Sequence, residues 1–566
     1  MPELHLDLNQ PHQQRLCVTL HHTPRQRQLG FALPRWTPGS YLLREYVGHL
    51  EGLQVHQGDK RLSPRRVTPF RWELELDSLE PVRLEYALQA TELTVRTCHL
   101  SAEHGFFALA AVALQIDGER WSSHRLSLAL PDGWNAFVPL PPSSDGSWEA
   151  RDFDQLIDSP LECGPHPCHR FAVAGVPHQW VSWGGDLPSS DRSWLHAVEQ
   201  VCLACCRLMG VERPAADAYL FVLHLSEHGY GGLEHDSSTV LQFGRRTLAG
   251  PDGRRKLLQL VAHEYLHQWN VRRLRPRELA PIDYGRAVVV PTLWFAEGVT
   301  SYVDQLLPHA AGLCDADAVL KDLGEDLSRY RLSPGRFVQS LSDSSQEAWV
   351  KLYRPHPYGA NQQISYYLKG AVLALVLDLH LRRQGSWLGA LLQQLWQSHG
   401  RQRRGYSSQD LIAVFARCAP DLGALLPQWL ESTEDPPLEA YLTDVGLALV
   451  PVAATSPSFG WQLEQRALGG LWISRIDREG PAQRAGLQVG DELIAAAGER
   501  LRSSADIALL INQVSPLQLL ICRDGLMRSH TLEPDQPAVE RWQLQDAPEA
   551  SALQRERRVA WLSLKP

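Results

Sequence analysis

The sequence predicts a multi-domain α+β protein with a β-rich beginning, a helical middle and a smaller β-containing unit near its end. Its 566 residues exceed what one hydrophobic core usually serves, so three or four domains are expected. Period-two segments fill about the first 165 residues, and helical periodicity dominates from about 250 to 440. With 44% hydrophobic and 21% charged residues, the composition is that of a globular chain, neither disordered nor fibrous.

Short alternating segments predict an N-terminal β-sandwich over residues 1–168. Residues 16–20, 70–76 and 82–88 alternate polar and apolar side chains, as strands with one buried face do. Clusters of Pro, Gly, Ser and Asp, such as the one at 141–146, interrupt these segments. Several short strands with frequent turns are typical of a sandwich.

The remaining elements define the other predicted units. Local signals are mixed between 170 and 245, after which four helices are expected, at 254–271, 295–307, 316–330 and 364–383. A Pro/Ser-containing stretch at 451–458 has the composition of a linker, and short strands return at 471–476 and 517–522. The predicted units are therefore 1–168, 169–448 and 456–540, followed by a C-terminal tail at 541–566.

Charge and hydropathy exclude several classes of partner. The net charge of -9 is mild and the two signs are interspersed, so neither nucleic acid nor an anionic membrane is an expected partner. No signal peptide is recognisable, and the longest apolar stretch, 371–377, is too short to cross a membrane. The ten cysteines form no dense framework and are expected to be reduced thiols in a cytoplasmic protein.

The strongest local motif is His263-Glu264-Tyr-Leu-His267. Two histidines four residues apart lie on one face of a helix, so both imidazoles can reach one tetrahedral zinc ion. Glu264 would project near the open coordination position, where it can take a proton from metal-activated water. The motif alone is moderately specific, since two histidines at this spacing also arise by chance.

A third ligand is available further along the chain. Glu297 opens another helical pattern after a gap of 29 residues and would complete a site of two histidines and one glutamate. Asp304 lies two turns beyond it, and a solvated helix acid is favoured over a role in orienting an imidazole.

Two more segments distinguish a peptidase from another hydrolase. Gly231 and Gly232 lie just before Glu234, where glycines let a ligand approach the backbone and a carboxylate can pair with a substrate ammonium. Tyr366 and Tyr367 offer phenols that can donate to the oxyanion of a tetrahedral intermediate. In isolation, the first segment is more often an ordinary turn and the second ordinary packing.

The cysteines form two close groups. Cys163 and Cys168 flank His166, with His169 beyond, but a loop with two free thiols is favoured over a metal site because no second Cys/His pair follows. Cys202, Cys205 and Cys206 lie in an apolar helical pattern over residues 201–209. They are expected to be buried and to pack as small hydrophobic side chains.

Taken together, these motifs resemble the glycyl aminopeptidase family of gluzincin zinc metallopeptidases, which carry a PDZ domain. The resemblance extends over nearly the whole chain and rests on four segments: the Leu-Pro-Arg-Trp-Thr-Pro-Gly-Ser-Tyr-Leu-Leu-Arg run at 33–44, Gly-Gly-Leu-Glu-His at 231–235, the zinc helix continuing over 267–276, and Tyr-Leu-Lys-Gly at 367–370. It implies a thermolysin-like catalytic domain with one zinc ion per chain and peptides as substrates. By the resemblance, Glu234 would bind the substrate amine, and Tyr367, in preference to Tyr366, would stabilise the oxyanion. Small (Gly or Ala) or acidic N-terminal residues would be preferred.

The segment 480–494, Gly-Pro-Ala-Gln-Arg-Ala-Gly-Leu-Gln-Val-Gly-Asp-Glu-Leu-Ile, resembles a PDZ signature. A PDZ domain can capture a peptide C-terminus by adding it to a sheet edge, and a spacer role is given equal weight. Two alternatives to the aminopeptidase stay open. One is a zinc endopeptidase whose PDZ domain recruits unfolded chains, and the other is a peptide-binding protein with a vestigial site.

Overall fold

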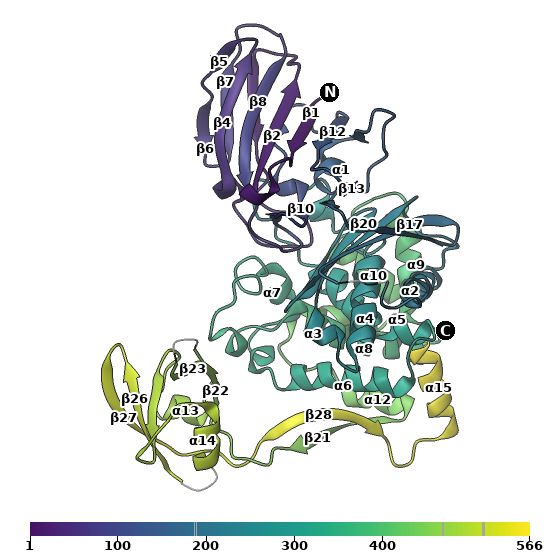
Figure 1. Ribbon diagram of the computed structural model, residues 1–566. Coiled ribbons are helices and arrows are strands. Elements are labelled where there is room, and N and C mark those ends of the chain that lie inside the picture. Colours follow the sequence, from purple (N-terminus) through teal and green to yellow (C-terminus); the bar gives the residue numbers. More distant parts are fainter. Residues whose placement is uncertain (186, 188, 467–468, 512–514) are drawn as a thin grey trace. The chain divides into compact units, whose positions relative to one another are not determined.

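The computed structural model describes residues 1–566 except 186, 188, 467–468 and 512–514 (Figure 1). The chain forms two compact units. The first comprises Met1–Val290, Leu306–Cys314 and Gly389–Ser407, and the second comprises Pro291–Gln305, Asp315–Leu388 and Ser408–Pro566. Each unit draws on several stretches of sequence, since two segments from the helical part of the chain belong to the first unit.

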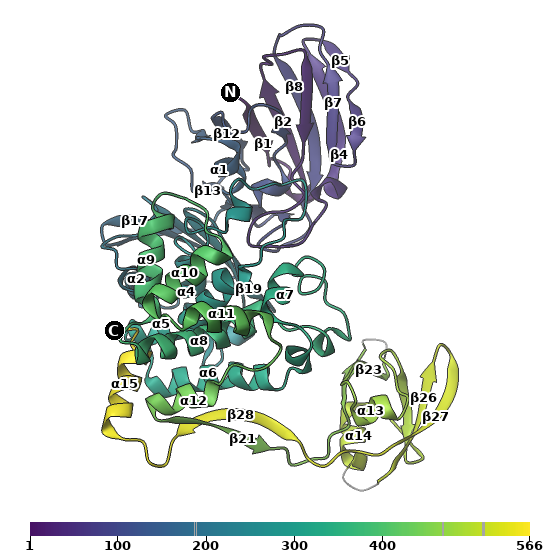
Figure 2. The ribbon, with the colours of Figure 1, turned by 180° about the vertical axis from the view of Figure 1, so that it is seen from behind.

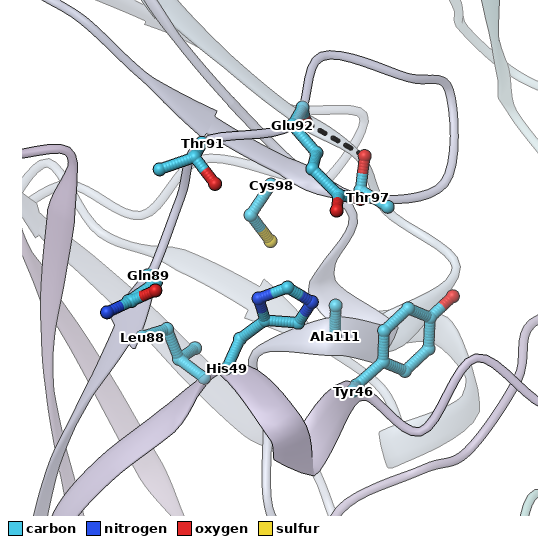
Figure 3. Close-up of a pocket in the computed structure, with 9 residues that line it drawn as sticks. All are labelled: Tyr46, His49, Leu88, Gln89, Thr91, Glu92, Thr97, Cys98 and Ala111. Atoms are coloured by element: carbon cyan, nitrogen blue, oxygen red, sulfur yellow. Dashed lines mark hydrogen bonds between the residues drawn. The ribbon is translucent and has the colours of Figure 1, made fainter.

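The N-terminal part of the first unit is a β-domain. Its largest sheet has the order β14 (Trp148–Ala150), β12 (His124–Ala129), β1 (Glu3–Asp7), β2 (Arg15–His22), β8 (Val82–Gln89), β4 (Leu50–Gln57) and β5 (Lys60–Leu62). A second sheet has the order β11 (Gln115–Ile116), β3 (Gln28–Ala32), β7 (Arg71–Glu75) and β6 (Arg65–Thr68). Figure 1 and Figure 2 both show these strands layered side by side.

Alternation explains why this part of the chain forms sheets. Along β2, Leu16, Val18 and Leu20 are buried while the residues between them face outward. A third sheet, β13 (Asn135–Phe137), β15 (Leu161–Gly164), β10 (Gly105–Phe107) and β9 (Cys98–Leu100), completes the region, with the short helix α1 (Phe153–Ile157). The N-terminal β-rich prediction is confirmed.

A five-stranded mixed sheet fills the region where the sequence signals were mixed. Its order is β16 (Cys168–Val173), β17 (Val176–Trp183), β18 (Tyr219–Ser226), β20 (Ser238–Gly244) and β19 (Tyr230–Glu234). The strands β17, β18 and β20 run parallel, and the outer strands β16 and β19 are antiparallel to their neighbours. The central strand β18 is buried on both faces and therefore lacks the alternation by which strands are recognised.

Helices pack on this sheet. The helix α4 (Gly253–Leu266) places Tyr265 over Phe221 of β18, with ring centroids 5.7 Å apart. The helix α2 (Trp194–Leu208) packs against α4 and buries Cys202, Cys205 and Cys206, as predicted. The short helix α3 (Arg245–Leu248) joins β20 to α4.

The rest of the middle region is helical, as predicted. A five-residue π-helix at Trp294–Gly298 leads directly into α5 (Val299–Ala310). The other helices are α6 (Ala316–Arg331), α7 (Leu341–Gln346), α8 (Tyr366–Arg383), α9 (Leu388–Leu395), α10 (Ser408–Cys418), α11 (Leu422–Glu431) and α12 (Leu438–Leu442).

Within the described part of the chain, one helical segment is long and apolar enough to cross a membrane by length and composition. It is Gly359–Arg383, which contains α8 and has a mean hydropathy of 1.4. Of its most apolar 18-residue window, 89% is buried inside the protein, as expected for a core helix. Asp378 within it is fully buried and accepts a hydrogen bond from the Tyr302 hydroxyl at 2.9 Å.

The C-terminal β-unit has the sheet order β22 (Trp461–Gln465), β23 (Leu471–Ile476), β24 (Glu492–Ala496), β26 (Leu517–Arg523) and β27 (Leu526–Leu532), with β25 (Glu499–Arg500) paired to β24. Two short helices, α13 (Pro481–Arg484) and α14 (Ser504–Ile511), accompany it. Its own apolar core includes Leu471, Ile473 and Leu519, so the predicted strands bury one face together.

The segments that flank this unit are more ordered than the sequence suggested. The predicted linker begins inside β21 (Leu447–Ala453), which pairs antiparallel with β28 (Val539–Asp546). The predicted tail contains the end of β28 and the helix α15 (Ala552–Leu562), whose Trp561 donates a 2.6 Å hydrogen bond to the Tyr302 hydroxyl. The tail is therefore a folded segment anchored on α5.

Candidate metal centre and active site

The first predicted histidine, His263, lies in the last turn of α4, and the second, His267, is the C-cap residue directly after the helix, which ends at Leu266 and not at 271 as predicted. The rings of His263 and His267 have centroids 4.7 Å apart and planes nearly perpendicular at 87°. His267 is buried, and its Nδ1 lies 2.6 Å from the carbonyl oxygen of Asn270. Because a carbonyl oxygen can only accept a hydrogen bond, Nδ1 of His267 carries the proton, and in the neutral ring Nε2 keeps a lone pair that suits a metal ligand.

Glu297 lies in the π-helix, and all five residues of that turn are buried. This turn packs closely on α8: a Cβ on Gly298 would lie 2.5 Å from the Cα of Gly370. A π-turn widens the helix locally and often occurs at functional sites, which the helical periodicity in the sequence does not reveal. Ligand atoms of His263, His267 and Glu297 all lie within 4.8 Å of one another. Two imidazoles and one carboxylate are the donor set that suits zinc with a coordination position left open.

The strand β19 holds the other predicted carboxylate. Glu234 ends this strand, its side chain is buried, and its Oε1 has no hydrogen-bond partner among the residues that the structure describes. Ligand atoms of Glu234, Glu264 and His267 also lie within 4.8 Å of one another. Glu234 therefore lies beside α4, although about 30 residues of sequence separate Glu234 from Glu264.

The glycines of β19 leave room for these carboxylates. A Cβ on Gly232 would lie 2.5 Å from the Cγ of Glu264, so the Glu264 side chain lies directly on the Gly232 backbone. The Gly232 carbonyl accepts a 3.2 Å hydrogen bond from Arg96. By contrast, a Cβ on Gly231 would meet open space, and this glycine faces away from both carboxylates.

Gly39, which sequence reasoning did not single out, is also part of the site. It has a left-handed φ of +81°, and a Cβ there would lie 2.6 Å from Oε1 of Glu234. The residue sits in the N-terminal β-domain, within the predicted 33–44 signature. The Pro-Gly turn at 38–39 was the available signal, but the sequence does not show what the turn contacts.

The two tyrosines begin α8, where Ser365 caps the helix by accepting a hydrogen bond from the Tyr367 amide. Their rings stack with centroids 4.7 Å apart. Tyr366 is fully buried and Tyr367 is half-buried, and the Tyr367 hydroxyl lies 3.1 Å from that of Tyr353. The greater exposure of Tyr367 favours it as the phenol that a ligand reaches.

A buried ion-pair network connects the segment after β19 to the segment that follows α4. Arg272 donates to Asp158 at 2.7 Å and to Asp236 at 3.0 Å, and His235 lies 3.1 Å from Asp158. Although burial acts to raise it, the guanidinium groups of Arg272 and Arg403 hold the pKa of the Asp236 carboxyl well below its usual range. The network links the Glu234-His235 pair to the chain just beyond His267.

The residues of this site lie in a region that is similar to a known peptidase family. Residues 256–373 match the M61 glycyl aminopeptidase family, and this range contains His263, Glu264, His267, Glu297 and Tyr367. The description "Peptidase M61 N-terminal domain" matches residues 3–165. The chain belongs to the M61 glycyl aminopeptidase family. A PDZ domain matches residues 472–521, as in the family resemblance drawn from the sequence.

Two solved structures are similar to this chain. An aminopeptidase N family protein from Idiomarina loihiensis is 26% identical, with a TM-score of 0.92 and 100% of both chains covered. An M1 zinc metallopeptidase from Deinococcus radiodurans, bound to a Tyr-Ser-Ala substrate, is 15% identical with a TM-score of 0.48, over 77% of this chain and 94% of that one.

Among curated proteins, a probable periplasmic serine endoprotease DegP-like from Halomonas elongata is 35% identical over 92 residues. The match covers 16% of this chain, which thus spans only 19% of that relative's length.

Proposed function

We propose that this M61 family protein is a zinc aminopeptidase that hydrolyses the first peptide bond of peptides. The observation that carries the proposal is Glu234: a buried carboxylate whose Oε1 has no partner among the described residues, grouped within 4.8 Å with Glu264 and His267. An ionised carboxylate is costly to bury without a partner. The free ammonium group of a substrate is the partner that its position beside the metal helix would provide.

The metal expected by family is proposed to be zinc, held by His263, His267 and Glu297. Their donor set fits zinc, and the Nδ1 contact of His267 fixes the tautomer that a ligand needs. A bound zinc ion would supply Lewis acidity toward the scissile carbonyl and the attacking water.

The residues around the metal then have separate tasks. Glu264 takes a proton from the attacking water and returns it to the leaving amine. Tyr367 donates its phenolic proton in a hydrogen bond to the developing oxyanion. Glu234 accepts hydrogen bonds from the substrate ammonium and so places the first peptide bond, and no later one, at the reacting centre.

The test compares aminoacyl fluorogenic amides with their N-acetylated partners, in the wild-type protein and in Glu234→Gln, with and without a chelator. We expect chelator-sensitive hydrolysis of free amines only, and a loss of about 10- to 100-fold in kcat/KM for Glu234→Gln, because a hydrogen bond to a charged group is worth about 1.5–3 kcal/mol. Unimpaired hydrolysis in Glu234→Gln would contradict the role of this carboxylate.

The panel also separates the alternatives. Cleavage of N-acetylated peptides that survives Glu234→Ala supports an endopeptidase that uses its PDZ domain to recruit chains. Zinc binding without cleavage of either set supports a peptide-binding protein or an enzyme with a narrower substrate range than the panel. Glycine and alanine amides lead the panel because the family is named for glycyl substrates, and aspartyl and glutamyl amides test the proposed acidic preference.

A peptide C-terminus is the ligand we propose for the PDZ domain. Its sheet ends in β22, a strand that pairs only with β23 within the described residues and so offers an edge for strand addition. Binding of a fluorescent peptide ending in a free carboxylate, compared with its C-terminal amide, tests this role independently of hydrolysis.

A further inference from the structure

A second group of potential metal ligands lies within the first unit. His104, Glu162 and His224 are fully buried, and their ligand atoms lie within 4.8 Å of one another. His104 directly precedes β10, Glu162 lies in β15 and His224 lies in β18. The group therefore joins the small sheet of the N-terminal β-domain to the five-stranded sheet. None of the three belongs to the site described above.

Three histidines approach the carboxylate of Glu162. Nδ1 of His104 lies 3.1 Å from Oε1 of Glu162, and Nε2 of His224 lies 2.9 Å from Oε2. Nε2 of His166 approaches Oε1 at 3.2 Å, and its side chain is 10% exposed. In a tetrahedral zinc site, bond lengths of about 2.0–2.2 Å separate neighbouring ligand atoms by roughly 3.3 Å. The observed N–O distances are close to that spacing.

Ordinary hydrogen bonding accounts for part of this arrangement only. Nε2 of His166 is directed at the carboxylate, yet it makes no hydrogen bond with acceptable geometry among the described residues. His178, another buried histidine of the five-stranded sheet, shows the usual alternative: Nδ1 contacts the Val176 carbonyl at 2.9 Å and Nε2 the Tyr265 hydroxyl at 2.9 Å. The cluster thus supplies one more imidazole than the carboxylate uses.

The cluster is also enclosed, because the side chains of His104, Glu162 and His224 are fully buried. Aromatic rings surround the pair: Trp183 stacks on His104 at 4.0 Å and Phe106 meets His224 edge-on at 4.9 Å. A carboxylate buried in such surroundings is stabilised by a cation bound to it.

We propose that His104, Glu162 and His224, with His166 at the rim, bind a second divalent transition-metal ion of the zinc class. Imidazole and carboxylate donors suit zinc. Because the three innermost side chains have no exposed surface, no substrate reaches the ion, and its role is structural. It ties the N-terminal β-domain to the sheet that bears β19 and Glu234.

The sequence motif around His166 acquires a different meaning from the one weighed above. The metal-binding alternative there used Cys163, His166, Cys168 and His169, whereas the potential ligands grouped in the described structure include neither cysteine. Only His166 of that motif joins the cluster. Glu162 lies four residues before His166, but His104 and His224 come from distant parts of the chain, which sequence spacing could not reveal.

The test is metal content per full-length chain, measured by mass spectrometry after purification in buffer supplemented with Zn²⁺. The wild-type protein is expected to hold two zinc ions, and His263→Ala/His267→Ala, which removes the proposed catalytic site, is expected to hold one. Adding His224→Gln to that background should leave none, whereas His178→Gln, a matched buried histidine of the same sheet, should leave the single ion in place.

One ion in the wild-type protein and none in His263→Ala/His267→Ala would overturn the proposal and show a hydrogen-bonded carboxylate in its place, with the proposed catalytic site intact. One ion in the wild-type protein that persists in His263→Ala/His267→Ala would support this cluster and contradict the proposed catalytic site. If His224→Gln fails to fold, Co²⁺ added to metal-free His263→Ala/His267→Ala during refolding decides: visible absorption of a nitrogen- and oxygen-ligated four-coordinate ion supports the site, and an unchanged spectrum refutes it.

Discussion

Gly39 provides the sharpest test of how the N-terminal β-domain takes part in the proposed reaction. In Gly39→Ala, the new methyl group would meet the Glu234 carboxylate, 2.6 Å from Oε1, so the carboxylate must move. Glu234 is the proposed acceptor for the substrate ammonium, so moving it weakens or removes a charge-assisted hydrogen bond worth about 1.5–3 kcal/mol. A loss of about 1.4 kcal/mol corresponds to a tenfold fall in kcat/KM. We expect kcat/KM for unblocked aminoacyl amides to fall about 10- to 100-fold, with zinc content unchanged.

The control is Gly118→Ala. Gly118 has nearly the same backbone conformation, with φ +79° against +81°, but a Cβ there meets nothing within 4 Å. Both variants carry the cost of an L-residue in the left-handed region, roughly 1–2 kcal/mol, and should melt at similarly lowered temperatures. Of the two glycines, Gly39 lies against Glu234 and Gly118 does not. Equal kinetic losses in the two variants, or wild-type kinetics in Gly39→Ala, would therefore refute the reasoning.

Three further predictions follow from the described side chains. Glu264→Gln should lower kcat by about 10²- to 10⁴-fold, the usual contribution of a general base, while bound zinc measured by mass spectrometry stays at the wild-type level; loss of the metal would instead indicate a ligand role. Tyr367→Phe should lower kcat by about 10²- to 10³-fold, as removal of an oxyanion donor does, whereas the buried Tyr366→Phe should change it little; the reverse order would exchange their roles. Burial lowers the pKa of His178 to about 4, so between pH 6.5 and 4 the unfolded chain binds the proton more tightly and stability falls as pH falls, by roughly 3 kcal/mol from this residue. In urea unfolding, the stability of His178→Gln should fall less steeply with falling pH over that range than that of the wild-type protein. An equally steep fall would contradict a lowered pKa at His178.

Much of the fold could be read from local pattern. Alternation predicted strands such as β2 and β8, and the 3.6-residue period predicted α6, because in those elements one face meets the core and the other does not. The pattern failed for β18, which is buried on both faces, and for the C-terminal segment, where β28 and α15 were predicted as a tail. In both cases burial depends on neighbours that are distant in sequence.

The candidate site divides in the same way. The sequence by itself determined the pair His263 and His267 with Glu264 between them, because spacing along a helix sets which side chains share a face. The tertiary structure decided that Glu234 from a sheet edge lies beside Glu264, that Gly39 of another domain touches Glu234, and that Glu162 gathers histidines from separate strands. Local periodicity specifies a direction for each side chain, whereas what it meets there depends on how strands pair and pack over long sequence separations.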